Sequence, residues 1–319
     1  MGKWTRRTFI ATGIAVGGAA AIGIVIRPGD RSDRVAGLLD AQEGEEVFSV
    51  WLKLAPDNTV TAIVPHAEMG QGVHTSLAMM LADELDADWN RVTMMEAPAH
   101  SEYANYALAK GYALGDTDVP DFLVPTIDGM FLTATKMKGL QITGGSMSVA
   151  TTGQFAMRVA GAAARAMLLQ AAANAWQVDA GELTASNSTI RHAGSGRQAS
   201  YGEFAAAAAA LPEPVVPRLK EPAEFTVMGT SPPRLDAPGK VDGSAVFGID
   251  AVLPDMKYAT VRAAPVFGAR VESVDATSVQ DMPGVRRVVN LGDAVGRGRR
   301  LLAGPAGNGP ARRDVFAEQ

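Results

Sequence analysis

The strongest constraint on the fold is a polar glycine loop that joins an apolar strand to an apolar helix. In "TVTAIV" (59–64) apolar residues alternate, which predicts a strand. The loop "HAEMGQG" follows, and a helix is expected from Thr75 or Ser76. Four apolar residues of that segment recur at helical spacing: Leu77, Met80, Leu81 and Leu85. This order of elements predicts an α+β fold with the loop at a helix entrance.

Composition excludes several classes of protein. With 319 residues, 47% of them hydrophobic and 20% charged, the chain can bury one large core or two or three modest domains. The net charge of −5 offers no basic surface for phosphates, so no nucleic-acid partner is expected. Cysteine is absent, which excludes disulfides and iron–sulfur ligation by this chain. The four histidines lack zinc-site spacing, so no metal ligands are expected.

Residues 1–30 have the pattern of an export signal or anchor. Arg6 and Arg7 precede an uncharged, Gly- and Ala-rich run over residues 10–26, which is short for a membrane-spanning helix. The arginine pair followed by Thr-Phe-Ile predicts the twin-arginine route, which carries folded and commonly cofactor-loaded proteins to the periplasm. An ordinary secretory signal is one alternative. An uncleaved membrane anchor is another, since no clear A-x-A cleavage site follows.

The segment after the leader predicts a spacer and then a region of strands. Residues 31–46 are polar and are expected to form the spacer. Residues 47–54 alternate and predict one strand, which pairs with 59–64 as a hairpin across "APDN". "RVTMMEA" predicts another short strand, whereas residues 98–129 show little periodicity and are expected to be rich in loops.

A second polar glycine loop, "QITGGSMSVATTG", also opens a helix. One stripe of that helix is predicted to be buried: Phe155, Val159, Ala162, Ala166 and Leu169. The other positions are so rich in alanine that neighbouring elements can approach closely. Further along, "ELTASNSTIRHA" predicts strands, and Ser200 and Glu203 have the spacing of a capping box that starts a short helix.

The remainder predicts a linker, a small module and an atypical tail. Residues 212–234 are proline-rich and predict a partly extended linker. Residues 235–292 predict an α+β module: two strands around a Leu-Pro turn, then strand, helix and strand. The tail, 293–319, has no hydrophobic period and many glycines and arginines. It is either a flexible basic tail or a frameshifted reading of GC-rich coding sequence, and reading the gene one nucleotide over distinguishes the two.

Both glycine loops end at the start of a helix. Unpaired N–H groups and the positive end of the helix dipole can hold an anionic oxygen there. In the first loop Gly70 and Gly72 flank Gln71, whose amide can both donate and accept. The binding candidates of the second loop are Gly144, Gly145, Ser146 and Ser148. The simpler alternative is that these glycines serve tight turns, and neither loop contains G-x-G-x-x-G or the lysine of a P-loop.

Glu68 lies beside the first loop and raises the question of a catalytic role. A carboxylate next to a cofactor loop could act as a general base, but nothing in the sequence raises its pKa. A loop acid that caps neighbouring backbone amides is the better-supported interpretation.

Several motifs together resemble those of one enzyme family. "EMGQGVHTSLAMMLADEL" is similar to the EMGQG-x-x-T motif of the xanthine dehydrogenase/aldehyde oxidase family, the molybdenum hydroxylases, with Thr75 at the last motif position. "ITGGSMSVATTGQFAMRVAGAAARAML" resembles the family's following cofactor loop and helix. Residues 235–292 resemble its a/b hammerhead domain, although Phe247 replaces a usual tyrosine. The hammerhead follows the EMGQG region, as in the β-subunits of the isoquinoline 1-oxidoreductase branch.

This resemblance implies that residues 47–211 are part of a molybdenum-cofactor-binding domain. It implies a molybdopterin cofactor, expected as the cytosine dinucleotide form, with the first loop on its pterin side and the second on its pyrophosphate or pterin. The implied cofactor-binding residues are Gly70, Gln71, Gly72, Thr75, Gly144, Gly145, Ser146 and Ser148. It also implies a [2Fe–2S] cluster on a small partner subunit, a cytochrome c as an electron acceptor, and an N-heterocycle or an aldehyde as substrate.

The chain departs from the family pattern in one important respect. The family's catalytic base is a glutamate in a C-terminal Gly-x-Gly-Glu motif, which is absent here, so no catalytic residue is assigned to this chain. Two interpretations remain open. The chain is the N-terminal part of an exported molybdenum hydroxylase large subunit, or it is a catalytically inactive, truncated remnant that binds cofactor or partner. An unrelated exported solute-binding protein is disfavoured by the joint motifs.

Overall fold

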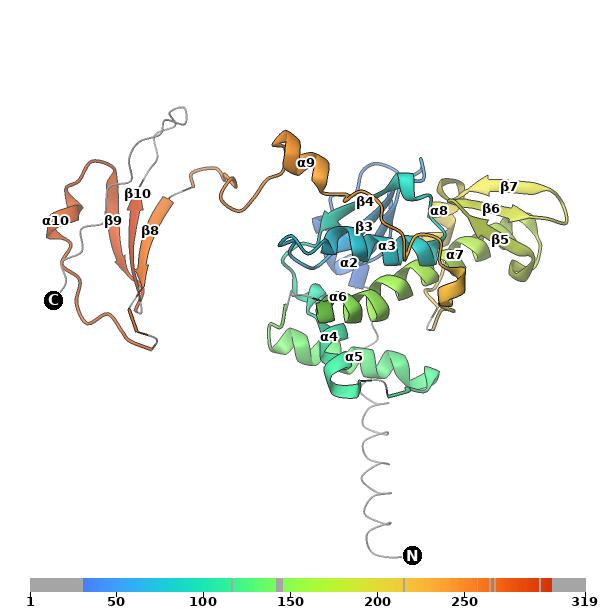
Figure 1. Cartoon of the computed structure of the whole chain (residues 1–319), viewed down its shortest axis with the longest axis horizontal. Helices are drawn as coiled ribbons and strands as arrows, with labels where there is room; N and C mark the ends of the chain where they lie inside the picture. The colour runs from blue at the N-terminus through green and yellow to red at the C-terminus, as the bar shows by residue number, and fades with distance from the viewer. Residues whose placement is uncertain are drawn as a thin grey trace, which may run out of the picture. The chain divides into compact units, whose positions relative to one another are not determined.

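The computed structural model describes residues 31–115, 117–141, 146–214, 216–256, 258–263, 265–266, 268–292 and 294–299. The chain divides into two compact units after Ser244, and each is described by itself (Figure 1). No helix in these ranges is long and apolar enough to cross a membrane. The predicted leader (1–30) and most of the predicted tail lie outside the described residues.

The first unit mixes helices and strands, which confirms the α+β prediction. Its α-helices are α2 (Arg31–Val35), α3 (Val73–Leu85), α4 (Tyr106–Leu114), α5 (Val124–Met137), α6 (Ser146–Thr152), α7 (Arg158–Trp176), α8 (Tyr201–Ala209) and α9 (Ala237–Asp242). Its strands are β1 (Glu46–Ser49), β2 (Leu52–Leu54), β3 (Val60–Val64), β4 (Val92–Glu96), β5 (Leu183–Ser186), β6 (Thr189–His192) and β7 (Arg197–Ser200). Short 3₁₀ turns are η1 (Ala36–Leu38), η2 (Trp89–Arg91), η3 (Ser101–Tyr103), η4 (Asp121–Leu123), η6 (Ala180–Glu182) and η7 (Pro222–Glu224), and the π-helix η5 (Gly153–Met157) joins α6 to α7.

The first sheet has the strand order β1-β2-β3-β4, and α3 connects its parallel pair, β3 and β4. The first glycine loop therefore lies at the carboxyl end of β3. β2 and β3 form the predicted hairpin, and β4 is the predicted short strand. The prediction of one strand over 47–54 is wrong, because the chain turns at Val50 and Trp51 and β1 pairs back onto β2. Both residues are buried and Ile63 donates to the Trp51 carbonyl, so tertiary contacts hold this turn.

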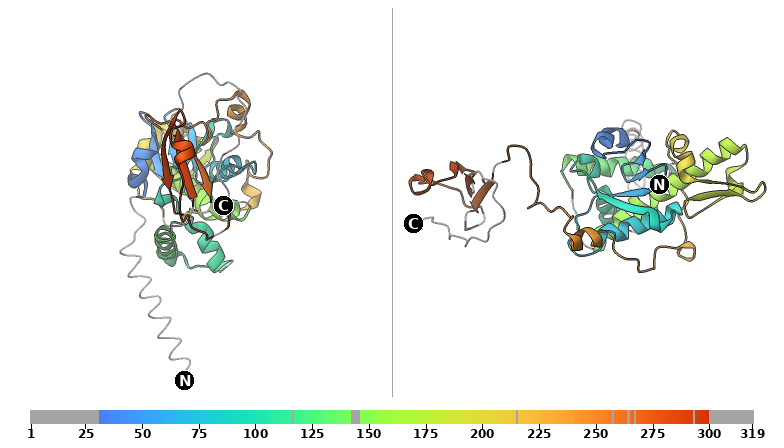
Figure 2. Two further views of the ribbon diagram at one scale, coloured as in Figure 1. Left: turned by 90° about the vertical axis from the view of Figure 1, so that its left-hand side faces the viewer. Right: turned by 90° about the horizontal axis from the view of Figure 1, so that it is seen from above.

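Helix α3 packs against both β3 and α7 (Figures 1 and 2). It begins at Val73, two residues before Thr75, because Gly72 at φ +78° makes the turn into it. The predicted apolar spacing is confirmed by three fully buried residues: Leu77, Leu81 and Leu85. Gly161 of α7 allows the close helix contact, since a Cβ there would overlap the backbone oxygen of Leu81.

The predicted buried stripe of the second helix is wrong. Ala166 is exposed, and Phe155, Val159 and Leu169 are only partly buried. The buried face is made mostly of small residues: Ala156, Ala160, Ala164, Met167, Leu168 and Ala171. A π-turn holds one residue more than an α-turn, so η5 shifts the register between Phe155 and α7. The prediction that neighbouring elements approach closely at the alanine-rich positions is confirmed, because α3 and α8 pack against α7 and most of its alanines are buried.

The prediction of a loop-rich region over 98–129 is also wrong, because α4 and the start of α5 lie there. Asn105 caps α4 by accepting from the Leu108 N–H at 3.0 Å. Lys110 stands in the buried part of α4, where Nζ is 2.6 Å from Asp128 of α5. Because Lys110 occupies a buried position, the apolar residues of α4 do not recur at regular helical spacing. The sequence therefore gave no signal for this helix.

The strands predicted after Trp176 are confirmed as the antiparallel sheet β5-β6-β7 beside α7 and α8. The capping box is confirmed too. The Ser200 N–H donates to the Glu203 carboxylate at 2.8 Å, at the start of α8. Both features are local, which is why the sequence was sufficient to predict them.

The polar segment 31–46 is not a free spacer, because it packs onto the first unit. Val35 and Leu39 are fully buried. Glu102, which is 2% exposed, pairs with three cations, two from α2 and one from α5: Arg31, Arg34 and Lys136. Two arginines of this segment therefore pair with Glu102, a buried acid that lies 68 or more residues further along the chain.

The Glu102 cluster makes stability depend on acid pH. Burial by itself would raise the pKa of Glu102, but hydrogen bonds from Arg34 and Lys136 and nearby positive charges lower it to about 2. Because the folded-state pKa lies below the ordinary value of 4.5, the contribution is present above about pH 4.5 and is lost as the pH falls towards 2. A shift of that size corresponds to roughly 3 kcal/mol.

We expect urea unfolding between pH 5 and pH 2 to show this loss in the native chain and a shallower pH dependence in Glu102→Gln. Glu43→Gln, at an exposed position, is the matched control and should keep the native profile. An unchanged profile in Glu102→Gln would contradict the assignment.

The proline-rich segment 212–234, predicted as a linker, is held against α3 along much of its length. The Asp83 carboxylate accepts the N–H groups of Thr226, Val227 and Met228 at 2.7–3.0 Å, and Glu84 accepts the Lys220 N–H. The Lys220 ammonium lies 3.1 Å from Asp83 and 2.6 Å from Asp86. No strand occurs among the described residues of this segment, which contains the short turn η7, and its backbone is bound by buried carboxylates.

The second unit contains β8 (Tyr258–Ala263), α10 (Thr277–Gln280), β9 (Val285–Asn290) and β10 (Ala294–Arg299), with the antiparallel order β8-β10-β9. Two strand predictions are wrong, since no strand occurs in the described residues 245–256 or 268–276. The central strand β10 is formed by the start of the tail that was predicted to be irregular. β10 is held by backbone hydrogen bonds to β8 on one side and β9 on the other, and such bonds do not require a hydrophobic pattern in its sequence. Assignment of this unit as an a/b hammerhead stays a prediction.

Candidate functional site

The first glycine loop is folded around the side chain of Glu68. Its Oε1 accepts the N–H groups of Gly70 at 2.8 Å and Gly72 at 3.0 Å, and its Oε2 accepts the His74 N–H at 3.3 Å. Gly70 and Gly72 have φ angles of +99° and +78°, a region that favours glycine. The capping interpretation of Glu68 is confirmed, and the N–H groups at the entrance of α3 already hold a carboxylate.

Arg234 holds Glu68 in this position from the other side. Its Nη2 lies 2.8 Å from Glu68 Oε1, and its Nη1 donates to the Gly70 carbonyl at 3.3 Å. Burial would raise the pKa of Glu68, but the backbone hydrogen bonds and the charge of Arg234 outweigh it and keep the pKa below its usual value. A carboxylate with a lowered pKa and three bound N–H groups is a weak proton acceptor. The general-base alternative is therefore disfavoured.

The other two first-loop candidates, Gln71 and Thr75, also have partners within the chain. Gln71 is exposed, its Nε2 donates to the Ala67 carbonyl at 2.8 Å, and its Oε1 accepts the Met69 N–H. Thr75 is buried, and its Oγ1 accepts the Leu235 N–H at 3.0 Å. Gln71 therefore lies at the surface with contacts confined to its own loop, whereas Thr75 fixes the chain that crosses the loop.

The second loop is described only at its two ends. Gly144 and Gly145 lie outside the described residues, and Ser146 and Ser148 are placed by their backbone, in the first turn of α6. The helix predicted to follow this loop is confirmed. It is interrupted by the π-helix η5, a form that often occurs at functional sites.

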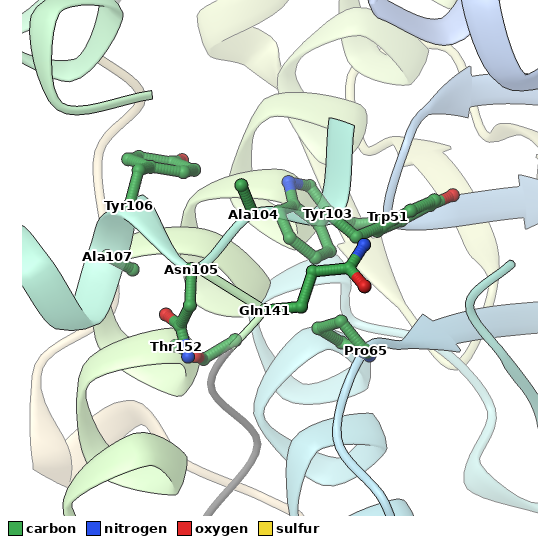
Figure 3. A pocket seen from close by; sticks show the side chains of 9 residues that line it. All are labelled: Trp51, Pro65, Tyr103, Ala104, Asn105, Tyr106, Ala107, Gln141 and Thr152. Atoms are coloured by element: carbon green, nitrogen blue, oxygen red, sulfur yellow. The ribbon is translucent and has the colours of Figure 1, made fainter. Parts of the chain in front are cut away.

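The bases of the two loops meet at one pocket (Figure 3). Pro65 leads into the first loop, while Gln141 and Thr152 stand on either side of the second. Trp51 and Tyr103 form the aromatic side of the pocket, with ring centroids 5.7 Å apart in an edge-to-face arrangement. Figure 3 shows the Gln141 side chain between this aromatic pair and Pro65. Segments about 75 residues apart in the sequence are therefore brought together at their bases.

A buried hydrogen bond also connects the two loops directly. His66 Nε2 lies 2.8 Å from Thr152 Oγ1, and both residues are 2% exposed. Burial lowers the pKa of His66 to about 4, so the ring is neutral at physiological pH. Sequence reasoning missed this pair. His66 stood at the edge of the quoted loop, but no local pattern predicts a partner 86 residues away.

One group of side chains has the residue types of a metal site, but a neighbouring arginine already neutralises its carboxylates. Glu68, His74 and Asp236 each place a ligand atom within 4.8 Å of the others. Arg234, however, pairs with both carboxylates, at 2.8 Å in each case. Its guanidinium supplies the positive charge that a cation would bring, and it would repel one. The expectation of no metal ligands is not tested by this arrangement.

The residues present fit a neutral ring edge better than an anion at the first loop. A Cβ added to Gly70 or Gly72 would meet no atom within 4 Å, so space remains beside the loop for a ligand. Gln71 offers an exposed amide that donates and accepts, as the polar edge of a pterin requires. The Glu68 carboxylate would repel a phosphate from the start of α3. The first loop thus suits a pterin and not a pyrophosphate.

Comparison with known proteins supports the resemblance seen in the motifs. The profile of the molybdopterin cofactor-binding domain family matches residues 13–108, which include the first glycine loop. The beta subunit of isoquinoline 1-oxidoreductase from Brevundimonas diminuta is 31% identical over 303 residues, covering 84% of this chain and 33% of that protein. The chain belongs to the molybdopterin-binding subunit family.

The chain is also similar to two other proteins. The membrane-bound aldehyde dehydrogenase [pyrroloquinoline-quinone] of Gluconacetobacter polyoxogenes is 30% identical over 298 residues, with 91% of this chain and 33% of that protein covered. A nicotinate dehydrogenase subunit of Pseudomonas putida is 26% identical over 272 residues, with 79% of this chain and 19% of that protein covered. The chain spans about a third or less of the length of these relatives.

Proposed function

We propose that this chain holds a molybdopterin cofactor between its two glycine loops, as part of an oxidoreductase. The main support is the proximity of the loop bases, where His66 and Thr152 share a buried hydrogen bond. The small cavity of about 10 Å³ between these bases is water-sized, so the pterin is assigned to the surface beside the first loop. The family membership supports molybdopterin as the ligand. Two loops that converge can grip one extended ligand at two points, which one loop cannot do.

The two loops are assigned different parts of the cofactor. Gly70, Gln71 and Gly72 contact the pterin, because Glu68 fills the anion position at the start of α3. The second loop contacts the pyrophosphate of a cytosine dinucleotide form through Gly144, Gly145, Ser146 and Ser148. Thr75 acts indirectly, by fixing Leu235 over the first loop. When bound, the cofactor supplies the redox chemistry, and these residues orient it.

The proposed reaction is the hydroxylation of an N-heterocycle or an aldehyde with water as the oxygen source. The printed names of the relatives, which mention isoquinoline, aldehyde and nicotinate, support this substrate class. The proposed route for the electrons leads to a small subunit with a [2Fe–2S] cluster and from it to a cytochrome c. The lack of cysteine in this chain is consistent with a cluster on another subunit. No catalytic base is assigned to this chain.

The proposed location is the periplasm, reached in the folded state by the twin-arginine route. The support is Arg6 and Arg7 ahead of the uncharged run at 10–26. Arg31 and Arg34 are bound to Glu102 in the folded unit, so processing of the leader has to occur before Arg31 to leave this cluster intact. Fusion of residues 1–30 to a folded reporter tests the route, and loss of export in an Arg6→Lys/Arg7→Lys variant is expected.

The cofactor assignment is tested by purifying the full chain, with the iron–sulfur subunit co-expressed, from a host that makes molybdopterin. We expect about one pterin and one molybdenum per chain, and a severalfold lower pterin content in Gln71→Ala. Gln198→Ala, another exposed glutamine, is the matched control and should retain the cofactor. A preparation without pterin would overturn the proposal.

The same preparations separate the two functional interpretations. Dye-linked oxidation of isoquinoline, quinaldine or an aldehyde supports a molybdenum hydroxylase. Bound pterin without any oxidation supports a catalytically inactive cofactor-binding remnant. Molybdenum analysis also distinguishes molybdopterin from the pyrroloquinoline quinone that one relative's name mentions.

A further inference from the structure

We infer that Thr152 and His66 are positioning residues, which couple helix α6 to the first glycine loop through a chain of hydrogen bonds, so that α6 helps to hold the first loop in its binding conformation. The inference rests on the proposed function and deepens it. It concerns two residues that are not among the proposed cofactor-binding residues, and it assigns them no contact with the cofactor.

The chain of hydrogen bonds is continuous from α6 to the first loop. Thr152 Oγ1 lies 2.8 Å from His66 Nε2, and the His66 carbonyl accepts from His74 Nε2 at 3.2 Å. The His74 backbone N–H donates in turn to Glu68, which accepts the Gly70 and Gly72 N–H groups. A displacement of α6 at Thr152 is thus passed on to the backbone of the first loop.

The protons of the two histidine rings can be assigned from their partners. A carbonyl oxygen only accepts, so His74 carries its proton on Nε2 where it faces the His66 carbonyl. His66 Nδ1 is buried without a hydrogen-bond partner. A proton there would leave a buried donor unpaired, so the favoured tautomer has the proton on Nε2, donating to Thr152. Each histidine ring is then a hydrogen-bond donor through Nε2, His66 to the Thr152 hydroxyl and His74 to the His66 carbonyl.

The links are buried, which makes the coupling strong. Thr152, His66 and His74 are 2%, 2% and 5% exposed, so water cannot readily replace a lost partner. The π-helix η5 begins directly after Thr152, at Gly153, where an added Cβ would meet the end of the Met80 side chain of α3. The segment with Thr152 is therefore anchored on α3, the same helix that the first loop enters.

The first test measures the coupling without any ligand. In Thr152→Val, which keeps the side-chain shape but removes the hydroxyl, we expect hydrogen exchange at the Gly70, Gly72 and His74 amides to quicken roughly tenfold. Thr152→Ser should restore the native rates, because it keeps the hydroxyl. Unchanged exchange in Thr152→Val, or equal acceleration in Thr152→Ser, would overturn the coupling.

The second test measures pterin retention in the full chain with the iron–sulfur subunit present. Thr152→Val and His66→Leu should each retain roughly tenfold less pterin, whereas His66→Gln should retain most of it, because its amide nitrogen can stand in for Nε2. The double variant Thr152→Val/His66→Leu should be no worse than either single one, as expected of residues that act through one bond. Additive losses would contradict the inference.

The two tests also keep the inference and the proposed function apart. If the native chain holds no pterin, the proposed function fails, and the exchange rates still decide the coupling. If the native chain holds pterin and Thr152→Val holds as much while exchange is unchanged, the inference alone fails. Thermal unfolding of each variant identifies general destabilisation, which would change exchange throughout the first unit and not only at the loop.

Discussion

Replacing Asp83 with alanine is expected to destabilise the first unit by about 3–5 kcal/mol. The side chain is fully buried and accepts three backbone N–H groups and the Lys220 ammonium, so its removal leaves four donors without this acceptor. Burial alone would raise the pKa of Asp83, but these donors outweigh it and keep the pKa low, so the group is charged at neutral pH. Urea unfolding at pH 7 measures the loss.

The control for this prediction is Asp33→Ala, at an exposed position, which should change stability by less than about 0.5 kcal/mol. Asp83→Asn should fall between the two, because the amide keeps one acceptor oxygen but not the charge. Limited proteolysis adds a local readout, since cleavage within residues 216–236 is expected to increase in Asp83→Ala. A stability loss below about 1 kcal/mol would show that the hydrogen bonds of Asp83 to residues 226–228 and Lys220 contribute little to the stability of the first unit.

Replacing Gly161 with alanine is expected to destabilise the chain by about 2 kcal/mol or more, despite alanine's higher helix propensity. A Cβ at this position overlaps the Leu81 backbone oxygen and lies 3.0 Å from the Glu84 Cβ, so α3 and α7 would have to move apart. Because the two glycine loops lead into α3 and α6–α7, the same change should also lower pterin retention. Thermal unfolding and pterin content of one preparation measure both effects.

Gly37→Ala is the matched control, because a Cβ there meets no atom within 4 Å. We expect it to be neutral or slightly stabilising. If Gly161→Ala is as stable as the native chain, α3 and α7 can move apart without a loss of folding free energy. The close packing of these helices would then not be needed to hold the loops.

Local patterns predicted the local elements well. The alternation at 59–64 and the spacing of Leu77, Leu81 and Leu85 predicted β3 and α3 correctly. Ser200 and Glu203 predicted the cap of α8. Predictions went wrong where one pattern fits two structures. Alternation over 47–54 is the same for one strand as for two antiparallel ones, and the π-turn at 153–157 breaks a count that assumes 3.6 residues per turn.

The candidate site divides in the same way. The glycines around Gln71 and the capping role of Glu68 were evident from residue types and spacing, because an acid and nearby backbone amides interact locally. Arg234, His66 and Thr152 were not found. Each acts on a residue 86 or more positions away, and a residue type by itself does not identify a distant partner.

Residue types and their spacing were sufficient to indicate the family, the order of strand, glycine loop and helix, and the loops to which a cofactor is assigned. Folding adds the contact of Arg234 with Glu68 and the meeting of the loop bases at His66 and Thr152, neither of which was indicated by residue types and spacing. The physical reason is the separation along the sequence of the residues that interact. Periodicity and capping depend on neighbours a few residues apart, whereas buried ion pairs and hydrogen bonds form between segments that only folding brings together.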